Sequence, residues 1–191
     1  MILSAHSVAK GPLPATSLEV ATGGVTLVPV EGGQRPTLLA LILAGRMTPA
    51  AGDVTLDGAS DARQLRRRVA IVDAPDTSAP VDDLPLASVV TEEFVFSGLR
   101  GPRRAARRLL ADEGLSDHAS TPIGDLPAAA RIRVLTRTAA APPSVDALVL
   151  TAPDRHGGDT ADWLDAAHAW AARRYAVIVL ASAGAIAAAR A

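Results

Sequence analysis

At residues 28–46 a short apolar run passes through a glycine turn into a longer apolar run. This order predicts a buried strand followed by a buried helix that begins near Pro36, where proline loses no useful N–H group. A phosphate-binding loop occupies such a place and has the pattern G-x-x-x-x-G-K-[ST]. Here the first glycine falls on Pro29, and the last three positions read Gln34, Arg35 and Pro36. The scaffold of a nucleotide site is therefore present, while most of its chemistry is missing.

With 191 residues, the chain is long enough for one well-buried core and too short for two comfortable domains. The formal net charge of −1 gives no reason to expect nucleic acid or an acidic membrane as the main partner. The chain has no cysteine, which excludes disulfides and thiolate metal sites and fits a reducing compartment. The amino terminus lacks the pattern of a signal peptide, and the longest weakly polar run, residues 175–189, is too short to cross a bilayer. We expect a cytoplasmic protein.

Apolar runs that are rich in branched residues and bounded by turns predict the strands. They lie at residues 2–9, 17–30, 54–58, 69–73, 147–151 and 175–181. Helices are predicted after Pro36, at residues 62–68, at residues 160–174 and at the carboxyl-terminal end. Strands that alternate with helices predict right-handed crossovers and a mainly parallel central sheet, which is an α/β fold.

Residues 85–137 contain no convincing strand and show helical periodicity in three segments. The segments are 86–97, 102–114 and 127–139. We therefore predict a single domain whose α/β core comprises residues 1–83 and 140–191. Residues 84–139 form an inserted α-helical subdomain.

The order of these segments resembles the nucleotide-binding domain of ATP-binding-cassette (ABC) transporters over nearly the whole chain. The residues that carry the resemblance are 35–39, 43–58, 66–72, 123–131, 146–154 and 176–182. They resemble, in turn, the phosphate-loop helix, its following turn and strand, the strand before the glutamine loop, the signature segment, the Walker B strand and the strand before the switch histidine. The resemblance implies a P-loop NTPase-like fold.

In the phosphate loop, the resemblance places the family's lysine on Arg35, its magnesium-binding hydroxyl on Pro36 and the preceding glycine on Gln34. Pro36 has no N–H to offer, and Gln34 carries a side chain where the backbone must approach the phosphate closely. Gly32, Gly33, Arg35 and Thr37 remain suited to an anion. The candidate nucleotide-binding residues are therefore Gly32, Gly33, Gln34, Arg35, Pro36 and Thr37. We expect no cofactor, with ATP and Mg²⁺ as the alternative ligands.

The family's other functional positions also fall on residues that lack the required groups. The glutamine of the glutamine loop falls on Ala74, and the switch histidine falls on Ser182. The Walker B aspartate and glutamate fall on Thr151 and Ala152, although Asp154 follows closely and offers a carboxylate. The signature Ser-Gly-Gly-Gln falls on Pro127, Ala128, Ala129 and Ala130. Phosphoryl transfer depends on metal and charge placement, so we predict no catalytic residues and lean against an enzyme.

Three other clusters each admit two interpretations. The acidic and histidine residues at positions 154–168 suit either a metal site or an acidic helix start, and we expect the helix start. The arginines at 66–68, 100–108 and 131–137 suit nucleic acid or a solvated face, and we expect the solvated face. Trp163 and Trp170 lie seven positions apart on one helix and suit a ligand box or the core, and we expect the core.

Phe94 and Phe96 lie where the family receives a segment of the membrane subunit, so the resemblance implies a partner groove there. The alternative is that both rings pack the helices onto their own core.

The predicted function is a catalytically degenerate ABC-type cassette that is an accessory or regulatory partner of a membrane transporter or complex. Its partner is an integral membrane protein or a second cassette, in a homo- or heterodimer, which would place the chain at the inner face of the membrane. The alternatives are a weak ATPase subunit that uses Arg35 and Asp154, and a cytosolic regulatory module.

Overall fold

The computed structural model describes residues 1–190 and is built around a four-stranded parallel sheet. The strands are β3 (Val25–Pro29), β5 (Val69–Val72), β6 (Ala147–Thr151) and β7 (Ala176–Ala181), in the order β3-β7-β6-β5. Strands β6 and β7 are buried at every position, as expected for the centre of a parallel sheet covered on both faces. The predicted α/β fold with a parallel central sheet is confirmed, and it is consistent with a P-loop NTPase-like fold.

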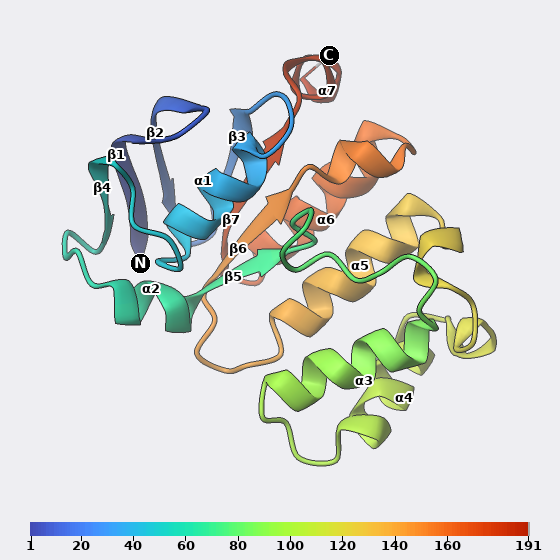
Figure 1. The fold of residues 1–191 in the computed structure, drawn as a ribbon. Helices are drawn as coiled ribbons and strands as arrows, with labels where there is room; N and C mark the ends of the chain where they lie inside the picture. Colours follow the sequence, from blue (N-terminus) through green and yellow to red (C-terminus); the bar gives the residue numbers. More distant parts are fainter. Residues whose placement is uncertain (191) are drawn as a thin grey trace.

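A second sheet, which the sequence did not indicate, is antiparallel and lies beside the first (Figure 1). Its strands are β1 (Ile2–Lys10), β2 (Leu13–Ala21) and β4 (Ala51–Leu56), in the order β2-β1-β4. Strands β1 and β2 are joined by only two residues, Gly11 and Pro12, and so short a connection permits antiparallel pairing alone. The prediction placed β1 within one residue of its ends and β4 within three, but it began β2 four residues late, at residue 17. It did not assign these strands to a sheet of their own.

Helix α1 (Arg35–Leu43) lies between the two sheets, as Figure 1 shows. Its buried residues are Pro36, Thr37, Leu39, Ala40, Ile42 and Leu43. The helix is apolar on nearly all sides because both sheets cover it, whereas the sequence predicted cover from one sheet only. Helix α2 (Ala62–Arg68) follows β4, and the Asp61 side chain caps it by accepting from the N–H groups of Arg63 and Gln64.

The remaining helices lie on the far side of the parallel sheet from α1. They are α3 (Leu86–Phe96), α4 (Pro102–Asp112), α5 (Ala128–Ala139), α6 (Thr160–Ala172) and α7 (Ala183–Ala189). Short 3-10 turns occur at Ser116–His118, Ile123–Asp125 and Pro153–His156. The three helices predicted between residues 86 and 139 are present within a few residues of their expected ends. Their apolar faces belong to the same continuous core as the parallel sheet.

The described part of the chain contains no helix that is long and apolar enough to cross a membrane.

Candidate functional site

The loops that follow β3, β5, β6 and β7 all lie at one edge of the parallel sheet, because parallel strands end on the same side. In open α/β sheets, ligands bind at this edge. The candidate site therefore comprises the turn before α1, the loop 73–83, the turn 152–159 and the start of α7. Every family position named above, apart from the start of α5, lies in one of these segments or directly beside it.

The turn before α1 contains two glycines whose backbone conformation favours glycine. Gly32 and Gly33 have φ values of 76° and 53°, a region that favours glycine, and an added Cβ would meet no atom within 4 Å at either position. Arg35 is exposed, and its Nη1 donates only to the Glu31 carbonyl, at 3.4 Å. The N–H of Arg35 donates to the Gly32 carbonyl at 3.3 Å. At the start of α1, the Arg35 N–H is therefore engaged within the turn, and Pro36 has no N–H to offer an anion.

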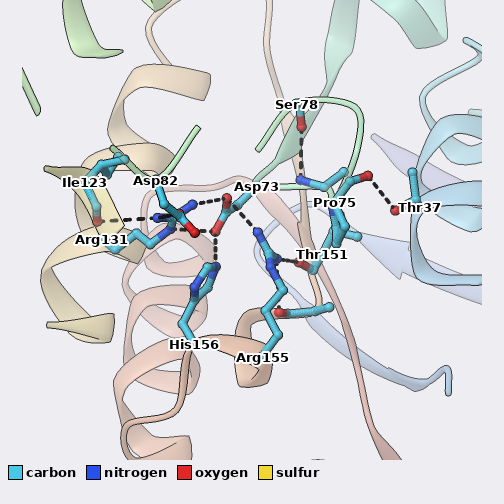
Figure 2. Close-up of polar contacts among 12 residues, drawn as sticks. Thr37, Asp73, Pro75, Ser78, Asp82, Ile123, Arg131, Thr151, Arg155 and His156 are labelled. Atoms are coloured by element: carbon cyan, nitrogen blue, oxygen red, sulfur yellow. Dashed lines mark hydrogen bonds and ion pairs between the residues drawn. The ribbon is translucent and has the colours of Figure 1, made fainter. Parts of the chain in front are cut away.

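The hydroxyl of Thr37, a residue predicted to bind phosphate, makes a hydrogen bond within the protein. Its hydroxyl donates to the Pro75 carbonyl at 3.2 Å, which joins α1 to the loop after β5 (Figure 2). The side chain is buried beneath that loop. Thr37 thus contributes to the position of loop 73–83.

Two carboxylates of the chain accept hydrogen bonds from the N–H groups at the start of α7. Glu31 Oε1 accepts from the Ala183 N–H at 3.3 Å, and Asp154 Oδ2 accepts from the Ser182 N–H at 3.2 Å. The Ser182 hydroxyl caps the same helix by accepting from the Ala185 N–H at 3.2 Å. Asp154, the residue that offered a substitute magnesium ligand, is therefore engaged as a backbone acceptor.

The chemical centre of this edge is a buried ion cluster around Asp73, the residue directly after β5 (Figure 2). The Asp73 side chain is 2 % exposed and faces three possible donors. Arg131 of α5 binds both oxygens, with Nη2–Oδ1 at 3.0 Å and Nε–Oδ2 at 3.1 Å. Arg155 Nη2 lies 2.8 Å from Oδ1, and His156 Nε2 lies 2.8 Å from Oδ2. Arg131 also donates to Asp82 Oδ1 at 2.9 Å. We call these five residues the Asp73 cluster.

Within the Asp73 cluster, opposite charges offset the effect of burial on the pKa values of Asp73 and Arg131. Burial acts to raise the pKa of Asp73, but the hydrogen bonds from His156 and Arg131 and the charges of Arg155 and Arg131 outweigh it, so the pKa lies below its usual value. Burial acts to lower the pKa of Arg131, yet Asp73 and Asp82 hold that pKa above its usual value. Among the described residues, no buried side-chain nitrogen or oxygen lacks a hydrogen-bond partner. The buried atoms of the cluster therefore offer no unpaired group to a ligand, and Asp82, whose side chain is 74 % exposed, is its most accessible member.

Little space remains beside the Asp73 cluster. The cavity lined by Asp73, Arg131, His156 and Trp163 has a volume of about 10 Å³. A small-molecule site usually needs several hundred Å³. A hollow of about 290 Å³ lies between α5 and α6 and includes Arg133, Asp165 and Trp170 in its lining. That hollow belongs to the helices and not to the edge of the sheet.

The residues at the other family positions are parts of strands, turns and helix starts. Ala74 is fully buried, and its carbonyl accepts from the N–H groups of residues 77, 78 and 79. Thr151 is buried at the end of β6, and Ala152 adopts a left-handed conformation with φ of 48°. Pro127 is the N-cap of α5, and Ala128, Ala129 and Ala130 form its first turn.

The acidic and histidine residues at 154–168 do not assemble a metal site. His156 turns to Asp73, while Asp159 and Asp162 form a capping box at the start of α6. Within residues 1–190 there is no group of three or more His, Asp or Glu side chains that could hold a metal ion. The predicted acidic helix start is therefore what the structure contains.

The aromatic residues divide between core and surface. Trp163 is buried in the core as predicted, and Trp170 packs edge-to-face on Tyr175 with ring centroids 4.8 Å apart. Phe94 is 4 % exposed and packs in the core, whereas Phe96 is 82 % exposed. The structure does not bring the two phenylalanines together in one groove.

The Asp73 cluster was not predicted from the sequence. A signal for it does exist: Arg131 lies on the otherwise apolar face of α5, and Asp73 directly follows a strand of four apolar residues. Two opposite charges at positions where apolar residues are expected suggest a buried pair. Nothing in the sequence, however, indicates that Arg155 and His156 join them.

No model of a protein family matches this chain, and no curated protein matches it either. Solved structures do match it, and one is described as the structure of the ATP-binding subunit of an ABC transporter. The similarity covers 98 % of this chain and 82 % of that chain, with a TM-score of 0.66 and 18 % sequence identity. At this level of identity, the comparison shows that the two chains share a fold.

Proposed function

We propose that this chain is a catalytically degenerate ABC-type cassette, and that it is an accessory or regulatory partner of a membrane transporter or membrane complex. In this proposal it hydrolyses little or no ATP. Residues 84–139 are its helical subdomain, and residues 1–83 and 140–191 are its α/β core. Its partner is an integral membrane protein or a second cassette, which would bring it to the inner face of the membrane.

The observation that carries this proposal is the Asp73 cluster. It lies at the same edge of the sheet as the turn before α1, and its opposite charges satisfy one another. A triphosphate with Mg²⁺ needs donors and carboxylates that are free to reach it. Opening the cluster would leave buried charges unpaired, at a cost of several kcal/mol per ion. In this proposal, charged groups at the edge of the sheet are committed to interactions within the fold.

A nucleotide titration tests the proposal most directly. ATP alone and ATP with Mg²⁺ should leave the melting temperature of the purified chain nearly unchanged, because binding to the native state would raise it. Isothermal titration calorimetry should show no saturable heat, and phosphate release should not exceed that of buffer. Robust hydrolysis that Arg35→Ala abolishes would contradict the proposal.

A weak ATPase remains the second candidate because Arg35 is exposed and makes one long side-chain hydrogen bond. Its planar guanidinium suits a phosphate. This candidate requires saturable, magnesium-dependent binding that Arg35→Ala and Asp154→Ala each weaken. Arg63→Ala, a change at an exposed arginine on α2, is the matched control.

The third candidate is a cytosolic regulator without a transporter partner. It predicts that the chain isolated from solubilised membranes brings no integral membrane protein with it.

A further inference from the structure

Apolar and basic side chains gather where α3 ends and α4 begins. Three of the five large apolar residues that are exposed in the described chain lie here within five positions, namely Val95, Phe96 and Leu99. Exposed arginines follow directly. They are Arg100, Arg103, Arg104, Arg107 and Arg108. We call these eight residues the α3–α4 patch.

The arginines of the α3–α4 patch differ from most other arginines of the protein. Arg131, Arg133 and Arg137 all pair with carboxylates. No ion pair or side-chain hydrogen bond joins the five patch arginines to any other residue between 1 and 190. Residues 94–111 contain these five arginines and no acidic residue. Glu92 and Glu93 precede this stretch, and Asp112 and Glu113, which follow it, pair with Arg137 and Arg133. A chain whose net charge is close to zero therefore carries a concentrated positive charge at this one place.

The geometry of α4 directs these arginines outward. Ala106, Leu109 and Leu110 are buried on one side of the helix, and the four arginines that lie within α4 are exposed. Between α3 and the start of α4 lies a hollow of about 650 Å³ whose lining includes Val95 and the side chains of Arg103, Arg104 and Arg107. Figure 1 shows the connection between α3 and α4 at the outer edge of the molecule, far from both sheets.

We propose that the α3–α4 patch binds the surface of an anionic phospholipid bilayer. The guanidinium groups would contact lipid phosphates, while Phe96, Val95 and Leu99 would enter the region between headgroups and acyl chains. A bilayer interface offers negative charge and apolar surface side by side, which is the combination that the patch presents. A nucleic acid or an acidic peptide would match the arginines but would leave Phe96, which is 82 % exposed, without an apolar partner.

This inference goes beyond the proposed function and does not depend on it, since direct contact with lipid needs no partner protein and no nucleotide. It also revises the expectation from net charge, because the distribution of charge decides local attraction. The arginines and the phenylalanine make separable contributions, and each can be removed without disturbing a buried residue.

Vesicle co-sedimentation tests the proposal, with vesicles of phosphatidylcholine alone and of phosphatidylcholine mixed with phosphatidylserine. The unmodified chain should bind only the mixed vesicles, and binding should weaken as salt is added. The variant Arg103→Gln/Arg104→Gln/Arg107→Gln should lose about a hundredfold in affinity, since each basic residue near an anionic surface contributes about 1 kcal/mol. The matched control is Arg63→Gln/Arg67→Gln/Arg190→Gln, which removes the same charge from other exposed positions and should bind like the unmodified chain.

Phe96→Ser tests the apolar contribution and should lower the affinity for mixed vesicles about tenfold, while the melting temperature stays unchanged because the ring is exposed. Phe96→Trp should add a tryptophan emission component that shifts to the blue when mixed vesicles are present. Equal affinity of the triple variant and its control would overturn the proposal. So would tighter binding to poly-glutamate or duplex DNA than to mixed vesicles, or vesicle binding that Phe96→Ser leaves intact.

Discussion

At the scale of single residues, Asp73 matters most because its carboxylate is buried and receives groups from two other segments of the chain. Replacing one partner of a buried pair leaves the other charge unpaired. We expect Asp73→Ala and Arg131→Met each to lower the free energy of unfolding by about 3–5 kcal/mol, measured by urea denaturation. The double variant should cost less than the sum of the two. The control Arg133→Ala, at a half-exposed arginine whose partner Glu113 keeps its ion pair with Arg137, should cost at most about 1 kcal/mol.

The depressed pKa of Asp73 also predicts an acid-dependent stability. A carboxyl group with a lower pKa in the folded state stabilises the fold above its unfolded pKa, and this stabilisation is lost as pH falls through the folded value. The usual value is 3.8, so the loss should begin near pH 4 and continue below it. Asp73→Asn should show a shallower fall in unfolding free energy over this range. An identical acid slope in the variant would show that other carboxylates govern the transition.

At the scale of elements, the antiparallel sheet depends on Gly52 at the start of β4. Its φ is 77°, and an added Cβ would lie 2.2 Å from the His6 carbonyl oxygen, on the irregular stretch of β1. Gly58 has a similar φ of 82°, but a Cβ there would meet nothing within 4 Å. Gly58→Ala should therefore cost about 1–2 kcal/mol for its backbone conformation alone. Gly52→Ala should cost about twice as much or more, and equal losses in thermal unfolding would contradict the steric argument.

At the scale of the whole molecule, residues 84–139 share their core with the parallel sheet. Phe94 and Leu109 belong to the same apolar cluster as Leu148 and Trp163. We therefore expect a single cooperative unfolding transition, in which far-ultraviolet circular dichroism and tryptophan fluorescence coincide. Two separated transitions would show that the helical subdomain unfolds independently.

The elements could be predicted from the sequence to within a few residues because each one is bounded by a local signal. Pro36 and Pro102 mark helix starts, and Asp57 with Gly58 marks a turn. The partition into two sheets was harder to foresee, since it depends on which strands pair. The nucleotide-binding residues expected at positions 32–37 stay a prediction, because they rest on the resemblance. The Asp73 cluster could not be predicted, because Asp73 and Arg131 are 58 positions apart and only the tertiary fold brings them together.

Helix α1 has a consequence for how this chain reaches its native state. Its residues touch strands of both sheets, and nearly every side of it is apolar. It cannot be fully covered until β1 and β2 on one side and β5, β6 and β7 on the other have formed. Partly folded chains therefore expose an apolar helix that favours aggregation. The exposure lasts until the slower of the two sheets has assembled, because contacts between distant residues form slowly. The yield of refolding should fall as protein concentration rises.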